Sequence, residues 1–373
     1  MSQITEDQIG IAIAGLGFGQ IVHLPALRST ESLRPLALWH PNKNKVSAIS
    51  NTNGLEGYSN WEKLLNNKEI KGIVIATPPE PRFKLALEAL EEEKHLFLEK
   101  PVCLKSSQIK LLRKIALSKN LSVCVDFEYR AVPLFMKAQK MLKEKVIGDV
   151  WFVKLDWLMS SRSDENRLWN WYSDETKGGG VIGALGTHAF DILHWLFGPT
   201  KSTKGYLTTI IKERPIDLQR GIYKEVTSED IALAQIELND LERNKIIPAQ
   251  ISLSSITKKG RGFWLEIYGS EGNLIIGSDN QKDYVHGLAM WHTDNKNQTI
   301  SINPDEDQKF SKTWTDGRIA PVNRLQNCWA ESIRTGKPII PGLAEGLASQ
   351  KVCEELKSSN NSTSFKKNAQ EEL

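Results

Sequence analysis

The chain has 373 residues, which is enough for two domains of ordinary size with substantial cores. Its 48 basic and 45 acidic residues leave a net charge of +3, and these charges are scattered along the sequence. The balance argues against nucleic acid and against a membrane surface as partners, and no apolar run reaches the length of a membrane span.

The cysteine pattern and the first residues are those expected of a cytoplasmic protein. The four cysteines lie far apart and form no C-x-x-C pair, so we expect reduced thiols and no metal site among them. The opening MSQITEDQ has no charged leader followed by an apolar core, which argues against export.

A glycine-rich turn follows the first predicted strand, in the stretch QIGIAIAGLGFGQIVHLPALRST. Isoleucines alternate with small residues over residues 9–14, which is typical of a strand buried on both faces of a parallel sheet. Gly15 would permit a tight turn, and Gly17 the close approach of a pyrophosphate where the next helix begins. The fingerprint G-x-G-x-x-G expects a small residue where this chain has Gln20, and a plain structural turn is the alternative. We expect the turn to bind a dinucleotide through Gly15, Gly17, Phe18, Gly19 and Gln20.

The second predicted strand, residues 36–39, ends without the carboxylate that would bind the ribose 2′-hydroxyl of NAD. His40, Asn42, Lys43 and Lys45 follow instead, and such side chains can receive the 2′-phosphate of NADP. We therefore predict NADP in preference to NAD, with His40, Asn42 and Lys43 at the adenosine end. The alternative is that these are ordinary loop residues.

Strands and helices alternate through the rest of the first half. The predicted strands are residues 70–77, 95–98 and 121–127, and the predicted helices are residues 61–67, 83–92 and 106–118. This order predicts an α/β domain with a doubly wound parallel (Rossmann) sheet, whose ligands lie beyond the carboxyl ends of the strands. Gly15, Thr77 and Lys100 all fall at such ends.

The segments AGLGFG, IATPP and HLFLEKP, at these intervals, resemble the glucose–fructose oxidoreductase, inositol dehydrogenase and MocA family of NAD(P)-dependent oxidoreductases. The resemblance implies that Lys100 lies near the nicotinamide and assists proton transfer at the carbinol, with Thr77, Pro78 and Glu99 beside the cofactor. A lysine there can also polarise a carbonyl oxygen, or lose its proton if burial lowers its pKa. We expect the Lys100–Pro101 bond to be cis.

A second set of candidate residues lies in the segment KGGGVIGALGTHAFDILHWLFG, which resembles the family's GGG, G-x-H and H-x-x-D pattern. The resemblance implies that His188 touches the substrate hydroxyl and acts with Lys100; a histidine satisfied inside a helix interface is the alternative. Arg130 suits either the substrate cleft or an interdomain salt bridge, and the aromatic residues suit either a binding wall or a core. The predicted substrate-binding residues are Arg130, Trp169, Tyr172 and Asp191.

Two positions depart from the family pattern. Arg82 stands where a histidine is usual, and we expect it to affect the start of a helix more than the chemistry. Ala184 stands where an aspartate normally contacts the substrate and tunes the lysine. An alanine carries no charge, so either another carboxylate takes over, or the substrate differs, or the usual chemistry is lost. The candidate carboxylates are Asp174, Asp191 and Glu128.

The second half predicts an α+β domain. Short alternating segments between residues 206 and 276 indicate antiparallel strands in a large open sheet with one face buried. We expect a Rossmann domain at 1–127, a substrate-binding and oligomerisation domain at 128–357, and a disordered tail at 358–373. Residues 281–312 are predicted to form a long polar excursion over the cleft. The resemblance implies a homodimer or homotetramer built on the open sheet.

Together these features predict an NAD(P)-dependent oxidoreductase that moves a hydride between nicotinamide and a carbinol or ketone carbon of a sugar-like or polyol-like small molecule. Ala184 motivates an alternative hypothesis, a non-catalytic protein that binds a dinucleotide and senses a metabolite or a partner. Lys100 and His188 are the predicted catalytic residues.

Overall fold

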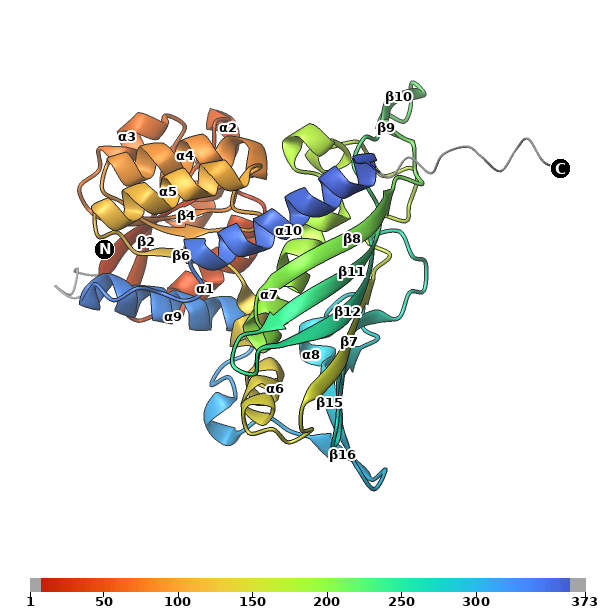
Figure 1. The fold of residues 1–373 in the computed structure, drawn as a ribbon. Coiled ribbons are helices and arrows are strands. Elements are labelled where there is room, and N and C mark those ends of the chain that lie inside the picture. Colours follow the sequence, from red (N-terminus) through yellow and green to blue (C-terminus); the bar gives the residue numbers. More distant parts are fainter. Residues whose placement is uncertain (1–7, 363–373) are drawn as a thin grey trace.

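The computed structural model describes residues 8–362, in which a parallel sheet and a larger mixed sheet lie side by side in two domains (Figure 1). The first sheet has six parallel strands in the order β3-β2-β1-β4-β5-β6. They are β1 (Ile9–Ala14), β2 (Leu33–Trp39), β3 (Glu56–Tyr58), β4 (Ile70–Ile75), β5 (His95–Leu98) and β6 (Val123–Val125). The two central strands, β1 and β4, are buried along almost their whole length, as their isoleucine-rich sequences predict.

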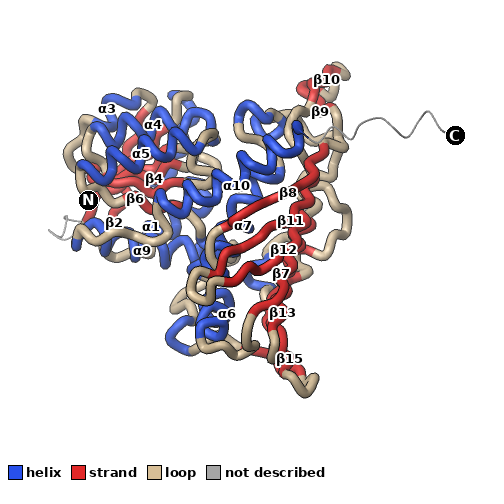
Figure 2. Tube along the Cα trace, viewed as in Figure 1, coloured by secondary structure: helices blue, strands red, loops and turns tan. Residues whose placement is uncertain are grey.

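Helices cover both faces of this sheet (Figure 2). On one face, α4 (Pro79–Glu91) and α5 (Ser106–Ser118) pack against β1, β4 and β5. On the other face lie α1 (Leu24–Arg28) and α9 (Ile319–Thr335). The helices α2 (Lys43–Asn53) and α3 (Trp61–Leu65) flank the strands β2 and β3. The predicted doubly wound α/β domain is therefore confirmed.

The chain crosses to the second domain through a 3₁₀ turn, η2 (Glu128–Ala131), and the helix α6 (Pro133–Lys143). An eight-stranded sheet follows, in the order β16-β15-β14-β13-β7-β12-β11-β8. Its strands are β7 (Val150–Leu158), β8 (Thr200–Thr208), β11 (Ile231–Asp240), β12 (Lys245–Ser254), β13 (Gly262–Gly269), β14 (Gly272–Ser278), β15 (Ala289–Asp294) and β16 (Thr299–Ile302). Only the pair β7–β12 is parallel among these described strands, which confirms the predicted, mostly antiparallel sheet.

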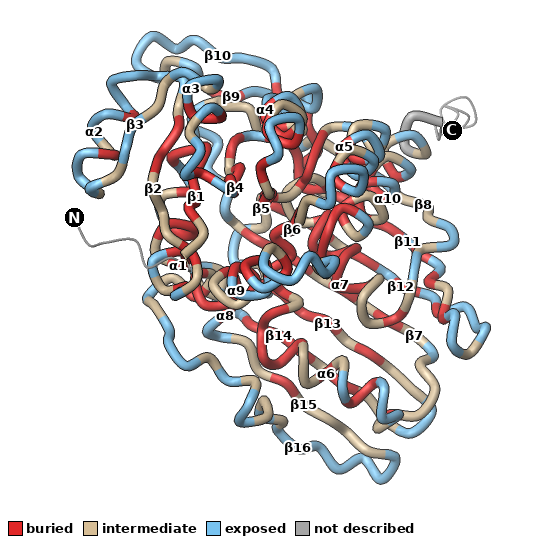
Figure 3. Tube along the Cα trace, turned by 90° about the vertical axis from the view of Figure 1, so that its left-hand side faces the viewer, coloured by how far each residue is buried: buried red, intermediate tan, exposed pale blue. Residues whose placement is uncertain are grey.

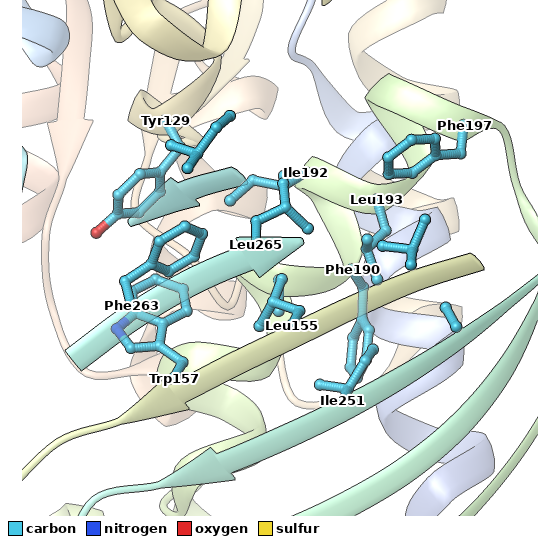
Figure 4. Close-up of a cluster of buried hydrophobic side chains, with 14 of the residues drawn as sticks. Tyr129, Leu155, Trp157, Phe190, Ile192, Leu193, Phe197, Ile251, Phe263 and Leu265 are labelled. Carbon is cyan, nitrogen blue, oxygen red and sulfur yellow. The ribbon is translucent and has the colours of Figure 1, made fainter. Parts of the chain in front are cut away.

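The core of the second domain lies between this sheet and the helix α7 (Thr187–Phe197), which a π-helical turn, η5 (Ile182–Gly186), precedes. Phe190 and Leu193 on α7 point toward Leu155 and Ile251 on the sheet (Figure 4). Burial alternates residue by residue along β11. Since successive side chains of a strand point to opposite faces, the other face of the sheet carries exposed side chains. Smaller elements beside the sheet are η3 (Trp171–Ser173), η4 (Glu175–Lys177), β9 (Glu213–Asp217) and β10 (Ile222–Glu225).

Two late helices tie the domains together. The helix α9 returns to the parallel sheet, where the Trp329 ring lies so close to Gly72 that a Cβ there would be 2.8 Å from it. The last helix, α10 (Leu343–Ser362), runs between the domains and contacts α5, α7 and β8 (Figure 1). At the start of α5, Ser106 donates its backbone N–H and its hydroxyl to the Glu354 carboxylate on α10.

Two expectations about irregular segments were wrong. Residues 281–312 contain the short helix α8 (Tyr284–Gly287), the strand β15, the edge strand β16 and a 3₁₀ turn, η6 (Glu306–Gln308), rather than a loop over the cleft. The strand β16 was not predicted because it is an exposed edge strand of four residues, too short for a clear apolar pattern. The helix α10 continues through residues 358–362, which were assigned to the disordered tail; residues 363–373 lie outside the described residues.

Buried residues follow the strands of both sheets, whereas β10, α2 and α3 form an exposed periphery (Figure 3). Within residues 8–362, no helix is long and apolar enough to cross a bilayer.

Candidate active site

A cavity of about 710 Å³ opens where the carboxyl ends of the parallel strands face the second domain. The first domain contributes the glycine turn after β1, the end of β2, and the loops after β4 and β5. The second domain contributes η2, the end of β7, η3, η5 and the start of α7. The cavity therefore lies at the place where this topology puts a cofactor and a substrate.

The glycine turn has the shape that a phosphate cradle requires. Gly15 has φ of +106°, and a Cβ there would lie 2.6 Å from the carbonyl oxygen of Ala76, so only glycine fits. A Cβ on Gly17 would meet nothing within 4 Å, because Gly17 faces the cavity. Gly19 begins the π-helical turn η1 (Gly19–His23), directly before α1. Phe18 also lines the cavity, whereas Gly19 and Gln20 do not.

The end of β2 forms one wall of the cavity. Trp39, His40 and Lys45 line it, and the lining on this side contains no carboxylate. Asn42 has a structural role, because its Oδ1 accepts a hydrogen bond of 2.9 Å from the Lys45 N–H at the start of α2. Lys43 is exposed and lies outside the lining. Burial, and then the charge of Lys45, lower the pKa of His40, which favours the neutral imidazole.

Lys100 reaches across the interdomain cavity. It follows β5 and precedes a cis peptide bond to Pro101, as expected. Its Nζ donates a 2.8 Å hydrogen bond to the carbonyl oxygen of Ala184 on η5. Burial lowers the pKa of Lys100, and the Glu99 and Glu128 carboxylates oppose that shift. Lys100 therefore joins the two halves of the cavity with an amine that loses its proton more readily than an exposed lysine.

Arg82 holds the loops around Lys100. Its guanidinium is buried and donates to the carbonyl oxygens of Thr77, Glu99 and Pro101. Burial lowers the pKa of Arg82 to about 10, so it remains charged at neutral pH. Arg82 thus fixes both strand-end loops, which is more than the effect on the start of a helix that the sequence suggested.

Glu128 and His188 lie together on the side of the second domain. His188 Nε2 is 3.5 Å from Glu128 Oε2, and both side chains line the cavity. Burial raises the pKa of Glu128 to about 8, although the Lys100 ammonium opposes the rise. Burial, and then Lys100, hold the pKa of His188 well below its ordinary value, so its imidazole is neutral. His188 Nδ1 is buried and has no hydrogen-bond partner among the described residues.

A buried group of three side chains lies beside Lys100 in the first domain, and its two acidic members favour the charged form of the lysine. His23 Nε2 lies 2.8 Å from Glu99 Oε1 and 3.7 Å from Asp126 Oδ2. Against the cost of burial, the hydrogen bond to His23 lowers the pKa of Glu99 to about 2. Burial and the Glu99 charge raise the pKa of Asp126 well above its ordinary value. The three ligand atoms lie within 4.8 Å, close enough for a metal ion, but one carboxylate beside one protonated carboxyl accounts for them without one.

Four predicted site residues have other roles or positions. Arg130 makes a buried bidentate salt bridge with Asp191, with both nitrogen–oxygen distances at 2.7 Å, outside the cavity lining. Trp169 also lies outside and donates its Nε1–H to the carbonyl oxygen of Glu225. Asp174 caps η4. Of the three candidate replacements for the missing aspartate, Glu128 is the one in the cavity.

Several lining residues were not predicted from the sequence. Trp157 ends β7, Arg162 follows it in an irregular segment, and Arg318 precedes α9. None lies in a motif, and all three reach the cavity through the packing of distant segments. The signal for Trp157 would have been its place in an alternating strand.

Two family models match the chain over most of its length. One, described as "Oxidoreductase family, NAD-binding Rossmann fold", matches residues 9–127. The other, "Oxidoreductase family, C-terminal alpha/beta domain", matches residues 139–366. The chain belongs to the glucose–fructose oxidoreductase, inositol dehydrogenase and MocA family. The predicted resemblance is therefore confirmed, and this family member has an NAD-binding fold.

Known relatives extend this assignment. An uncharacterized oxidoreductase of Synechocystis sp. is 40% identical over 342 residues, which cover 91% of each chain. Glucose-6-phosphate 3-dehydrogenase of Bacillus subtilis is 22% identical over 92% of this chain and 94% of its own. A solved structure of levoglucosan dehydrogenase with NADH and L-sorbose has a TM-score of 0.84 at 19% identity, over 95% of this chain and 97% of that chain.

Proposed function

We propose that the protein is an NAD(P)-dependent dehydrogenase or reductase that acts on a CH–OH group of a sugar-like or polyol-like molecule. The observation that carries the proposal is Lys100, which lines the cavity after β5 and whose amine donates to the Ala184 carbonyl oxygen of the second domain. Gly17, with open space where a side chain would stand, fits the approach of a dinucleotide. The names of two relatives, glucose-6-phosphate 3-dehydrogenase and levoglucosan dehydrogenase, support a sugar as the substrate class.

The cavity residues would manage a proton while the bound cofactor supplies or accepts the hydride. During oxidation, neutral Lys100 Nζ accepts the proton of the substrate hydroxyl, while its hydrogen bond to Ala184 keeps the amine in place. The Glu128 carboxylate stabilises the resulting ammonium by its charge. His188, whose neutral imidazole lines the cavity beside Glu128, would hold the same hydroxyl. During reduction, Lys100 returns the proton.

Glu128 also bears on the alternative function. The hypothesis of a non-catalytic binding protein depends on the missing aspartate at Ala184. Because Glu128 brings a carboxylate into the same cavity, beside His188 and close enough to Lys100 to act on its pKa, it supports the enzymatic proposal. The homo-oligomer and the cytoplasmic location expected from the sequence remain proposals.

The test of the proposal is Lys100→Ala. We expect turnover to fall by a factor on the order of a hundred or more, because the proton acceptor is lost. Cofactor affinity, measured by quenching of tryptophan fluorescence, should stay within a few-fold. Lys110→Ala, which removes an exposed lysine from α5, is the matched control. Near-normal turnover of Lys100→Ala on any substrate found in a panel of sugars, inositols and keto acids would remove the assignment.

We further propose NADP as the preferred cofactor. The end of β2 offers Lys45 and neutral His40 to the cavity and no acidic side chain that would select the 2′-hydroxyl of NAD. Titration should therefore show tighter binding of NADPH than of NADH. Lys45→Glu should weaken NADPH on the order of tenfold and leave NADH nearly unchanged, since only NADPH carries the 2′-phosphate. Tighter binding of NADH to the unaltered protein would contradict the proposal.

A further inference from the structure

Arg162 is a cationic side chain that lines the cavity, and hydrogen bonds to its backbone fix its position in the second domain. Its backbone N–H donates to the carbonyl oxygen of Ser255 at 2.8 Å, just beyond β12. Its own carbonyl oxygen accepts a 2.6 Å hydrogen bond from Arg214, whose guanidinium also donates to the carbonyl oxygen of Asp164. The main chain around Arg162 is therefore fixed on both sides, although the segment is irregular.

The guanidinium of Arg162 lies over the Tyr172 ring, with its central carbon 3.9 Å from the ring centre, and both side chains line the cavity. The stacking fixes the plane of the guanidinium but leaves its N–H donors along the edge unused. No acid forms an ion pair with it within the described part of the chain, and the charges of Arg167 and Arg214 disfavour its cationic form. Burial lowers the pKa of Arg162 to about 10, so the group is charged at neutral pH.

The two other arginines that line the cavity, Arg82 and Arg318, and the largely buried Arg130 outside its lining all have partners. Arg130 is paired with Asp191, Arg318 with Asp316, and Arg82 with three backbone carbonyls. Placing a cation in such surroundings without an opposite charge costs free energy, and proteins accept that cost mainly where a ligand supplies the missing anion.

The composition of the lining supports the same conclusion. Five basic side chains line the cavity (Lys45, Arg82, Lys100, Arg162 and Arg318) against two acidic ones (Glu99 and Glu128). The phosphates of a dinucleotide would offset the excess near the glycine turn and β2. Arg162 belongs to the second domain, where it lines the cavity with Trp157 and Tyr172. Neither acidic side chain is its partner, because Glu99 contacts His23, and Glu128 lies beside His188 and interacts with Lys100.

We propose that the substrate carries an anionic group, a carboxylate or a phosphate, and that Arg162 binds this group through its free N–H edge. The inference rests on the proposed function and narrows it from sugars in general to acidic or phosphorylated sugars. A planar guanidinium matches two oxygens of either group at once, which gives orientation as well as affinity. Binding at this point would hold the anionic end in the second domain and leave a carbinol free to approach Lys100.

The test is calorimetric binding to the full chain saturated with NADP, which requires no turnover. The ligands are glucose and myo-inositol as neutral probes, glucuronate and gluconate as carboxylates, and glucose 6-phosphate as a phosphate. We expect at least one anion to bind at least tenfold more tightly than the neutral probes. Arg162→Met should remove most of that preference while it leaves NADP affinity unchanged. The carboxylate and phosphate arms identify which group the guanidinium takes.

Two further variants make the result specific. Arg167→Met removes an exposed arginine five residues away and changes the net charge by the same amount, so it is the matched control. It should retain the preference for anions, because Arg167 does not line the cavity. Arg162→Lys keeps the charge but loses the planar fork, so it should give an intermediate preference even if Arg162→Met proves unstable. Equal binding of neutral and anionic probes, an equal loss for both in Arg162→Met, or no binding of any anion would overturn the inference.

The outcomes separate this inference from the proposed function. Anion binding that depends on Arg162, without turnover of any ligand, would leave the inference standing and count against hydride transfer. If Arg162→Met turned over neutral sugars at the same rate as the parent protein, hydride transfer would be supported and the role of Arg162 in binding an anion would be contradicted.

Discussion

Burial shifts the pKa values of Lys100 and Glu128 in opposite directions. Burial lowers the pKa of the amine and raises the pKa of the carboxyl to about 8, so the two values approach each other. Each charge partly offsets the other's shift, which means that the pair titrates as a unit. A lowered amine pKa makes the neutral form of Lys100 more accessible, and that form is the proton acceptor in the proposed oxidation.

We predict that Glu128→Gln changes the pH dependence of oxidation. In the unaltered protein, kcat/KM should rise through about pH 8, because Glu128 stabilises the Lys100 ammonium only after it has lost its own proton. The variant should lack this rise and lose activity on the order of a hundredfold, and Glu128→Asp should recover part of it. A pH–rate profile of the glutamine variant that matches the parent would exclude this role.

The same residues show what the sequence could reveal. Lys100 was predictable because the EKP motif marks it locally at the end of a strand. His188 was predictable because the apolar helical segment that carries it follows a GGG segment. Glu128 could be named only as one of three candidates, and Arg162 not at all, because their positions depend on how segments far apart in the chain pack around the cavity.

At the scale of elements, the loops after β4 and β5 act as one unit. Arg82 on α4 donates to a carbonyl oxygen in the first loop and to two in the second, on both sides of Lys100. No lysine can replace it, since a lysine has one nitrogen where a guanidinium offers three. The position of the Lys100 amine therefore depends on a residue that makes no contact with the substrate in the proposed reaction.

We predict that Arg82→Met lowers the free energy of unfolding by about 3 kcal/mol, because buried carbonyl groups lose a charged donor. Chemical denaturation measures this, and kcat should fall more than KM rises as the lysine loop loses its support. Lys84→Met, two residues away on the exposed side of α4, is the matched control. A parent-like unfolding midpoint and kcat would show that the loops hold their shape without Arg82.

The sequence predicted elements best where one physical signal dominates. The central parallel strands were predicted correctly because both of their faces are buried, so nearly every residue in them is apolar. The strands β15 and β16 were missed because most of their residues are at least partly exposed, so polar residues are tolerated and the neighbouring strands supply most of the order. The last turn of α10 was assigned to the tail because its Ser- and Asn-rich sequence has low helix propensity.

At the scale of the molecule, the uncovered face of the large sheet is the surface best suited to self-association. Tyr206 on β8 and Leu233 on β11 are cross-strand partners, with 53% and 47% of their surface exposed. Trp151 on β7 is 64% exposed. Helices cover the other face, so a second copy of the chain would bury these side chains.

We predict a homo-oligomer in light-scattering chromatography, and a shift toward monomer when Tyr206→Lys and Leu233→Lys are combined. Two charges in a sheet-to-sheet contact are expected to weaken it by at least tenfold, because each must be desolvated. Leu218→Lys, at an equally exposed leucine after β9, should keep the parent mass. A monomeric parent protein would refute the prediction.

The return of α9 to the parallel sheet has a consequence for how the protein can be divided. A fragment that stops at residue 127 holds all six parallel strands but lacks Trp329, whose ring fills the groove over Gly72 and meets Phe97 at 5.7 Å between ring centres. That fragment would present a long apolar trough to water. The parallel-sheet domain is thus completed only after ribosomes have added residue 329, about 200 residues beyond its last strand, so it is not a portable module.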